Sequence, residues 1–290
     1  MKILVLGANG LIGSTIFRVL NELSDHNVRG TIRHKSNSSI FSKDALKNIM
    51  TNIDVLDEFS LTDLFMEYRP NVIINCTGIT KHRLNANNPL MVLPINSLFP
   101  HKLVKLSKLI GARVIQISTD CVFSGDKGFY SEIDCPDSSD LYGISKSLGE
   151  VDYSNAITIR TSSIGHEKES NVGLLEWFLS QKSTCKGFNR AIFSGLPTVT
   201  LAKIIRDYVL QDNNLTGLYH LAAEPIDKLS LLQLIANMYK KNIKIVTDDT
   251  FIIDRSLSAE KFSQATGYIA PSWDFLIREM HNDFEGVINV

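Results

Sequence analysis

A tyrosine and a lysine four residues apart, Tyr142 and Lys146, are the side chains best suited to acid–base chemistry. On a helix this spacing places the phenol and the ammonium on one face. No other Tyr-x-x-x-Lys occurs in the sequence, and Ser118-Thr119 ends an apolar run, where open parallel sheets present ligand-binding groups. Reduction of a carbonyl group needs a proton on its oxygen while a hydride reaches its carbon. Here the phenol could donate that proton, the cation could assist it, and the Thr119 hydroxyl could hold the oxygen. A surface Tyr–Lys pair with a core hydroxyl is the alternative.

A glycine-rich turn upstream predicts a dinucleotide site. Gly7-Ala8-Asn9-Gly10-Leu11-Ile12-Gly13 directly follows a first apolar run and leads into a helical pattern. Glycines allow a tight turn, and amide groups at a helix N-terminus bind a pyrophosphate. The spacing is three and three, whereas the usual dehydrogenase fingerprint is G-x-G-x-x-G. A plain tight αβ connection is the alternative. The predicted cofactor contacts in the turn are Gly7, Asn9, Gly10, Leu11, Ile12 and Gly13.

The next apolar run bears on which dinucleotide binds. In NAD-binding proteins this strand ends in an acid that holds the ribose 2′-hydroxyl, but here Arg33 follows it. An arginine can pair with a 2′-phosphate, so NADPH is favoured, with NADH as the second choice. An exposed loop cation is the alternative reading of Arg33. Together, Lys146 and a nicotinamide ring are expected to lower the Tyr142 pKa by about two or three units.

Short β-rich runs alternate with helical spacing through the first half of the chain. The runs are apolar almost throughout, as expected for parallel strands with helices on both faces. This alternation predicts βαβ units and therefore an α/β fold of the Rossmann type, with an open, doubly wound parallel sheet. The predicted strands are Ile3 to Leu6, Val28 to Ile32, Val72 to Asn75, Arg113 to Ser118 and Ile157 to Arg160.

Beyond Ile164 the pattern loosens. Residues 165–171 and 182–189 are polar and are interpreted as an insertion into a substrate-binding region. The later predicted elements are helices at 201–210, 229–239, 259–266 and 273–280 and strands at 218–222 and 243–246. The predicted domains are a dinucleotide-binding domain over 1–164, to which 196–224 returns, and a smaller C-terminal α/β lobe for substrate, 165–195 with 225–290.

Composition and charge exclude several classes of protein. Of the 290 residues, 44% are hydrophobic and 21% are charged, which excludes a disordered or low-complexity chain. The net charge of −1 gives no reason to expect nucleic acid or a membrane as partner. The four cysteines are scattered, so no metal site or disulfide framework is predicted. The N-terminus has no signal-peptide core, and no apolar run approaches the ~18 residues of a membrane span, so we expect a cytoplasmic location.

With these motifs the sequence resembles the extended short-chain dehydrogenases/reductases, and among them most closely the dTDP-4-dehydrorhamnose reductase group of nucleotide-sugar reductases. The resemblance covers nearly the whole chain. Cys121 departs from it, because the group often has an aromatic residue there, and Ser163 stands where the rhamnose enzyme has a tryptophan over its substrate. The segments that carry the resemblance are 7–13, Asn75-Cys76-Thr77-Gly78, Ser118-Thr119-Asp120-Cys121-Val122-Phe123-Ser124-Gly125, Tyr142 to Glu150 and Arg160-Thr161-Ser162, with weaker matches at 195–198, 217–221 and 254–257.

The resemblance implies a role for each matching residue. Tyr142 would donate the proton, Lys146 would modulate it and bind ribose hydroxyls, and Thr119 would anchor the carbonyl oxygen. Further cofactor contacts are implied for Asp54, Val55, Cys76, Thr77, Gly78, Thr161 and Ser162. Substrate contacts are expected for Lys81, His82, Thr119, Asp120, Ser163 and Thr198.

Three functions follow as hypotheses. The leading one is an NADPH-dependent reductase of a nucleotide-diphosphate 4-keto-6-deoxy sugar, supplying a deoxyhexose for surface polysaccharide. The second is a nucleotide-sugar dehydratase or epimerase, although dehydratases tend to follow Thr-Asp with Glu, where this chain has Cys121. The third is a non-catalytic regulatory subunit that binds nucleotide, although the intact set of Thr119, Tyr142 and Lys146 speaks against it. Helices that flank such sheets commonly form dimers, so the sequence leaves a homodimer open without predicting the oligomeric state.

Overall fold

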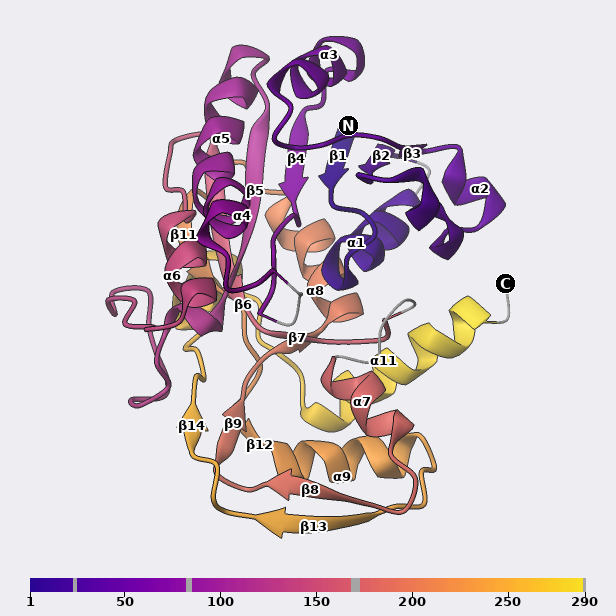
Figure 1. The fold of residues 1–290 in the computed structure, drawn as a ribbon, viewed down its shortest axis with the longest axis vertical. Helices are drawn as coiled ribbons and strands as arrows, with labels where there is room; N and C mark the ends of the chain where they lie inside the picture. The colour runs from indigo at the N-terminus through magenta and orange to yellow at the C-terminus, as the bar shows by residue number, and fades with distance from the viewer. Residues whose placement is uncertain (23–24, 82–84, 168–172, 289–290) are drawn as a thin grey trace.

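The computed structural model describes residues 1–22, 25–81, 85–167 and 173–288. At its centre is a wholly parallel sheet of β1 (Lys2–Leu6), β2 (Asn27–Thr31), β3 (Ile49–Met50), β4 (Val72–Asn75), β5 (Arg113–Thr119), β6 (Ala156–Thr161) and β11 (Gly217–His220). The strand order is β11-β6-β5-β4-β1-β2-β3 (Figure 1). The chain leaves β1 toward β2 and later returns on its other side with β4. Ligands bind in open α/β sheets at the carboxyl ends of strands where the order reverses in this way.

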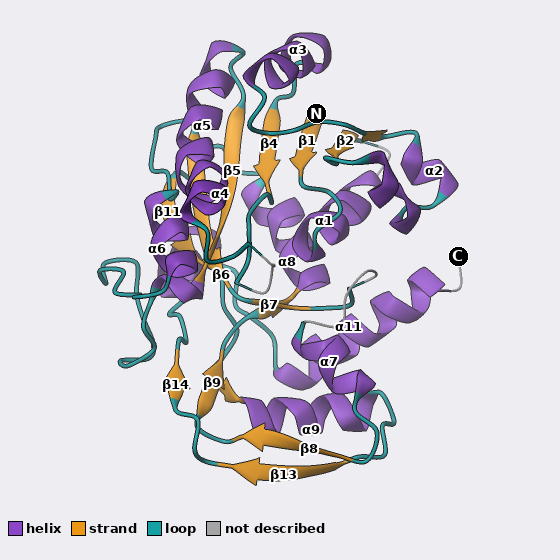
Figure 2. Ribbon diagram, in the orientation of Figure 1, coloured by secondary structure: helices purple, strands orange, loops and turns teal. Residues whose placement is uncertain are grey.

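Helices cover both faces of this sheet (Figure 2). Successive side chains of a strand point to opposite faces, so Ile3 and Val5 of β1 belong to one core and Leu4 and Leu6 to another. The first core is covered by α1 (Leu11–Asn21), α8 (Thr198–Ile204) and its π-helical continuation η4 (Ile205–Val209). The second core is covered by α3 (Glu58–Tyr68) and α5 (Phe99–Leu109).

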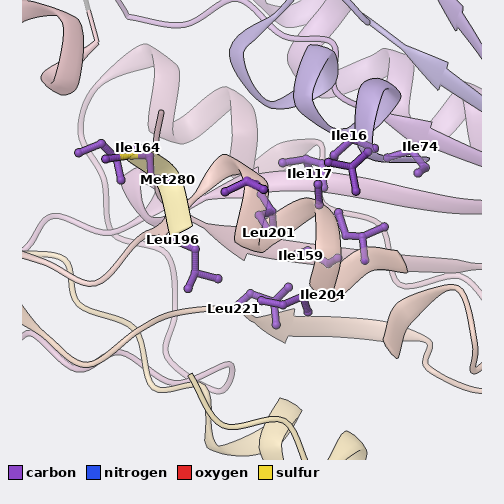
Figure 3. Packing of buried hydrophobic residues seen from close by; sticks show 14 of the residues in the cluster. Ile16, Ile74, Ile117, Ile159, Ile164, Leu196, Leu201, Ile204, Leu221 and Met280 are labelled. Carbon is purple, nitrogen blue, oxygen red and sulfur yellow. The ribbon is translucent and has the colours of Figure 1, made fainter. Parts of the chain in front are cut away.

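The first core also joins the sheet to the C-terminal part of the chain. Figure 3 shows Ile74, Ile117 and Ile159 of the sheet with Ile16 of α1 in one cluster of buried side chains. The same cluster extends to Met280 of α11 (Trp273–Ile288), which is 3% exposed. The two parts of the chain therefore share one hydrophobic core.

The C-terminal part lies beyond the carboxyl ends of β1 and β4 (Figure 1). Its strands are β7 (Ser163–Ile164) with β10 (Leu196–Pro197), β9 (Ala191–Phe193) with β12 (Ile226–Asp227) and β14 (Ile253–Asp254), and β8 (Thr184–Phe188) with β13 (Lys244–Asp248). Its helices include α7 (Leu174–Ser180), α9 (Lys228–Met238) and α10 (Glu260–Thr266). The remaining short elements of the described chain are η1 (Lys35–Ile40), α2 (Lys43–Leu46), α4 (Pro89–Leu93), η2 (Pro94–Leu98), η3 (Asp120–Val122) and α6 (Leu141–Leu148).

The doubly wound Rossmann-type fold predicted from the sequence is confirmed. The five strands predicted for the first half all form, and their ends shift by at most a residue. The strand predicted at 218–222 ends at His220, so its last two residues were wrong. Residues 182–189, for which no strand was predicted, contain β8. The return of β11 to the main sheet is observed, whereas the division into domains stays a prediction. In the described residues no helix has the length and apolar character to cross a membrane.

Candidate active site

The glycine turn is closed tightly at Gly7 and Gly13. Gly7 has φ +77°, and its carbonyl oxygen accepts a hydrogen bond from the Gly10 N–H at 3.1 Å. A Cβ on Gly13 would lie 2.2 Å from that same oxygen, so only glycine fits. Gly10 caps α1 without a side-chain hydrogen bond, and the first turn contains no acid. The first N–H groups of the helix are therefore available to an anion, and the turn fits a pyrophosphate.

Two further segments predicted to hold the cofactor lie beside this turn. The Cys76 N–H donates to the Leu6 carbonyl at 3.0 Å, which places the segment after β4 against the residue before the turn. The Ile53 N–H donates to the Ile32 carbonyl at 3.2 Å, which places Asp54 and Val55 next to the end of β2. The Arg33 side chain is exposed at that same end. Cofactor-site residues far apart in sequence thus gather at the carboxyl edge of the sheet.

The order of β5 and α6 brings the proposed catalytic residues together. Thr119 is the last residue of β5, and its hydroxyl lies within hydrogen-bonding reach of the Tyr142 phenol. The Asp140 carboxylate caps α6 by accepting from the Gly143 N–H at 2.7 Å. A Cβ on Gly143 would lie 2.2 Å from the Cys121 carbonyl oxygen, so α6 packs directly on the loop after β5. This close packing brings Tyr142 to Thr119.

Lys146 extends from the next turn of α6 toward β5. It is 7% exposed, and its Nζ donates to the Ile117 carbonyl at 2.6 Å. Burial lowers its pKa to about 8, while Glu150 acts in the opposite direction. The neighbouring Cys76 is half-buried, and burial of its thiol raises the pKa to about 12, so this thiol is neutral. The sequence-predicted pair of phenol and ammonium therefore lies in the same buried site.

The Tyr142 pKa differs from the sequence prediction. It was expected to fall, but in the protein alone it is raised, first by burial and then by Cys121, whereas the hydrogen bond with Thr119 acts to lower it. The physical reason is that a buried phenolate loses hydration. The consequence suits a proton donor, because a raised pKa keeps the proton on Tyr142 near neutral pH.

Cations from three separate segments lie near Asp120, the residue after Thr119. Arg255 and Lys81 both stabilise the Asp120 carboxylate, whose pKa is nevertheless raised because burial dominates. Burial and the charge of Lys81 lower the pKa of Lys228, the first residue of α9. The Arg255 Nη1 lies 3.5 Å from the Cys121 Sγ, and its buried Nε has no hydrogen-bond partner among the described residues. These charges could hold an anionic part of a substrate at this point.

The remaining predicted site residues are placed as follows. Thr161 ends β6 and donates to the Ser162 carbonyl at 3.0 Å, and Ser163 begins β7. Thr198 is 5% exposed, and its hydroxyl accepts from Thr15 of α1 at 3.2 Å, so it holds α8 to α1; its predicted contact with substrate stays a prediction. His82 lies outside the described residues.

Several buried polar residues around the site were missed from the sequence. Asn96, in the π-helical turn η2, donates to the Ile79 carbonyl and to the Ser145 hydroxyl, both at 3.0 Å. Gln116 receives a hydrogen bond from Asn75 at 2.7 Å across two strands. None of these residues forms a local motif, because each finds its partner only after folding. Lys228 was also missed, and no role was predicted for Glu150, Arg160 and Arg255, although all three lie in segments that carry the resemblance.

The glycine turn on a doubly wound sheet, with threonine, tyrosine and lysine at the sheet's carboxyl edge, defines an extended short-chain dehydrogenase/reductase. The family model described as RmlD substrate binding domain matches residues 1–285, and the chain belongs to this family. At the fold level it is similar to the crystal structure of dTDP-4-dehydrorhamnose reductase from Bacillus anthracis in complex with NADP. The TM-score is 0.79 at 20% identity, over 97% of this chain and 99% of the other.

Two kinds of curated relative are similar in sequence. The probable low-salt glycan biosynthesis reductase Agl14 of Haloferax volcanii is 33% identical over 151 residues, 52% of this chain and 48% of its own length. The methionine adenosyltransferase 2 subunit beta of Xenopus laevis is 23% identical over 272 residues, 86% of this chain and 76% of its own. The match thus spans about half of the archaeal reductase, and it spans 41% of the bovine subunit beta.

Proposed function

We propose that this protein is an NADPH-dependent reductase of a nucleotide-diphosphate 4-keto-6-deoxy sugar, in the supply of a deoxyhexose for surface polysaccharide. The observation that carries the proposal is the meeting of Thr119, Tyr142 and Lys146 at the carboxyl edge of the sheet that bears the glycine turn. The printed names of two similar proteins, a glycan biosynthesis reductase and a dTDP-4-dehydrorhamnose reductase with NADP, support it.

The residues of this chain divide the chemistry among them. NADPH, when bound, supplies the hydride that the carbonyl carbon accepts. The Thr119 hydroxyl donates a hydrogen bond to the carbonyl oxygen, and Tyr142 transfers its phenolic proton to that oxygen as it becomes a hydroxyl. The Lys146 ammonium stabilises the negative charge that develops on the Tyr142 oxygen. Hydride and proton together complete the two-electron reduction of ketone to alcohol.

The experiment that tests this function follows the absorbance of NADPH in the presence of a 4-keto-6-deoxy sugar linked to dTDP, UDP, GDP or CDP. We expect NADPH to be oxidised in an amount stoichiometric with one of these sugars. Failure to oxidise NADPH with every sugar of the panel, by protein that binds NADPH, would contradict the proposal.

Cofactor choice depends in this proposal on Arg33. The variant Arg33→Ala is expected to weaken NADPH binding by about tenfold or more, because a charge-assisted contact with the 2′-phosphate is lost. NADH, which lacks that phosphate, should bind within about twofold of the original protein, since Arg33 has no phosphate to pair with. Isothermal titration with both nucleotides measures the difference, and Lys43→Ala, an exposed cation of α2, is the control. An equal loss for both nucleotides would remove the argument for a 2′-phosphate contact.

Substrate recognition is assigned to the cations that surround Asp120. Lys228 is the first residue of α9, and Arg255 directly follows β14. Together with Lys81 they bring three positive charges near the single negative charge of Asp120. A diphosphate matches that excess of positive charge. The variant Lys228→Gln is expected to raise KM for the nucleotide sugar about tenfold and to leave kcat within about twofold, because the contact is equal in ground and transition states. Steady-state kinetics with Lys244→Gln as control checks this; a fall in kcat at unchanged KM would place Lys228 in the chemical step instead.

A nucleotide-binding regulatory subunit is the second candidate function. The observation that favours it is the similarity to methionine adenosyltransferase 2 subunit beta over 86% of this chain. The retained Thr119, Tyr142 and Lys146 oppose it, because a subunit that only binds nucleotide has no need of a proton donor. Stable co-elution with a methionine adenosyltransferase catalytic subunit, combined with no turnover of any ketosugar, would favour this candidate over the reductase.

The assembly and location of the protein are proposals. A homodimer would cover apolar side chains that are exposed on α4, η2 and α5, and light scattering would measure it. These side chains are Leu90, Leu98 and Leu109. The cytoplasmic location is proposed from the sequence. The class of substrate, nucleotide sugars, is also a proposal.

A further inference from the structure

A buried ion pair between Glu150 and Arg160 lies next to Lys146. Arg160 of β6 donates to both carboxylate oxygens of Glu150, from Nε at 2.7 Å and from Nη2 at 2.6 Å. The two side chains are 3% and 12% exposed. Ser118 donates a third hydrogen bond to the same carboxylate at 2.7 Å. Ser118 follows Ile117, whose carbonyl accepts a hydrogen bond from the Lys146 ammonium. One short stretch of β5 therefore binds both the Glu150 carboxylate and the Lys146 ammonium.

Glu150 is the carboxylate that acts on Lys146. Burial disfavours the ammonium, and Glu150 is the largest influence in the opposite direction. Cys76 also faces Lys146, but its pKa of about 12 leaves it an uncharged thiol. Tyr142, on the same helix, keeps its proton because burial raises its pKa. Near neutral pH the negative charge close to Lys146 is therefore that of Glu150.

On its outer side the pair contacts His220. Two acidic side chains lie near that histidine: Glu132 accepts a hydrogen bond from its N–H at 2.8 Å, and the charge of Asp134 acts on its ring. The Arg160 Nη1 lies 3.3 Å from Nε2 of His220, and Nδ1 of His220 lies 3.1 Å from the Tyr130 carbonyl. Burial, and then the charge of Arg160, lower the His220 pKa to about 3, so the ring is neutral. The neutral ring donates from Nδ1 to Tyr130 and accepts from Arg160 at Nε2. The Arg160 guanidinium also lies 5.0 Å from the centre of the Phe123 ring. Glu150 is thus one carboxylate between two cations.

We propose that Glu150 is a positioning residue of the reductase, whose carboxylate, held by Ser118 and Arg160, keeps the Lys146 ammonium charged beside Tyr142. The role of Lys146 in the reaction rests on the proposed function, but its charge in the protein alone does not. Arg160 holds the Glu150 carboxylate in place, and Glu150 in turn stabilises the ammonium against burial. A neutral Lys146 could no longer stabilise charge on the Tyr142 oxygen.

The test measures the titration of Lys146 directly. Competitive acylation across a range of pH, read by mass spectrometry of the Lys146 peptide, reports the pH at which the amine loses its proton. For the original protein without ligands we expect a midpoint of about 8. For Glu150→Gln we expect it to fall by about one unit or more, since the removed charge is the one that opposes the effect of burial on Lys146. Glu150→Asp keeps the charge and should restore most of the shift.

A double variant separates this role from a purely structural one. Glu150→Gln alone leaves Arg160 buried without its counter-charge and can prevent folding. Glu150→Gln with Arg160→Met removes both charges at similar volume, which is often neutral for stability. If Glu150 acts on Lys146, the double variant should fold, and its Lys146 labelling midpoint should be lowered as in Glu150→Gln. A midpoint unchanged from the original protein in the double variant would overturn the proposal. Glu58→Gln, which removes an exposed carboxylate paired with Lys102, is the control and should leave the midpoint unchanged.

Turnover provides a second readout. In Glu150→Gln the alkaline limb of the plot of kcat against pH should shift to lower pH together with the labelling midpoint. One pH unit above the new midpoint, kcat should be about tenfold below its plateau value. An alkaline limb that stays in place while the midpoint moves would also overturn the positioning role. If no ketosugar is reduced by the original protein, the proposed function fails, but the labelling midpoints still decide whether Glu150 keeps Lys146 charged.

Discussion

Tyr142→Phe is expected to lower kcat by about 10²- to 10⁴-fold, the usual contribution of a positioned general acid, and to leave the Kd for NADPH within about twofold. The substitution removes the phenolic oxygen and changes little else, because the ring keeps its volume on α6. It costs the hydrogen bond with Thr119, so a modest loss of stability accompanies the loss of turnover. Steady-state kinetics and NADPH titration on the same preparation measure both quantities.

Tyr153→Phe is the matched control for this result. Its side chain is 40% exposed, and its hydroxyl lies 3.1 Å from His101 at the surface, away from Thr119. This variant should retain normal kcat. Normal turnover in Tyr142→Phe as well would show that the proton comes from another group and would refute the assigned acid.

Gly13→Ala is expected to reduce the free energy of unfolding by about 2–4 kcal/mol and to abolish measurable NADPH binding at micromolar concentration. The new Cβ would lie 2.2 Å from the Gly7 carbonyl oxygen, which belongs to the backbone, so the turn must open. An opened turn no longer aims the N–H groups of α1 at a pyrophosphate. Urea unfolding and isothermal titration check the two effects.

Two further glycine variants control for the substitution itself. Gly286→Ala adds a Cβ with no atom within 4 Å on helix α11, so stability should be unchanged or raised by up to about 1 kcal/mol. Gly10→Ala places its Cβ 3.5 Å from the Gly7 oxygen, an ordinary contact, and should fold normally. Full stability together with normal NADPH binding in Gly13→Ala would contradict the closed turn described above.

The parts of the fold that could be predicted from the sequence are those with a local cause. β4 and β5 are buried along their whole length, and each contains a short apolar run that makes the strand visible in the sequence: Val72 to Ile74 in β4, and Val114, Ile115 and Ile117 in β5. The glycine turn and the Tyr142–Lys146 pair are each contained in a few residues. Thr119 was predicted because a strand end is where such a sheet presents ligand groups.

The parts that were missed depend on partners distant in sequence. β8 is a mixed polar segment, and it becomes a strand because it pairs in parallel with β13 across a long connection that contains α8 and α9. β3 is only two residues long and is defined by its pairing with β2. Neither hydrophobic period nor turn residues mark such elements, since the pairing itself creates them.

The electrostatics of the site were the least predictable feature. Lys146 together with a bound nicotinamide ring was expected to lower the Tyr142 pKa. In the protein alone burial raises it, and the degree of burial depends on how α6 packs on the loop after β5. Glu150 and Arg160 each lie in a segment that carries the resemblance, but nothing in the sequence indicated that they pair. Their effect on Lys146 arises only because β5 and β6 lie side by side.

The central claim is that hydride from NADPH ends on the carbonyl carbon of a nucleotide sugar while this chain supplies the proton. The most direct measurement uses NADPH with deuterium at the transferable position of the nicotinamide, mixed with the ketosugar that is reduced. We predict a product heavier by about one mass unit than that formed with ordinary NADPH, with the deuterium on C4 of the sugar. Product that carries no deuterium, or a sugar changed without consumption of NADPH, would contradict the account.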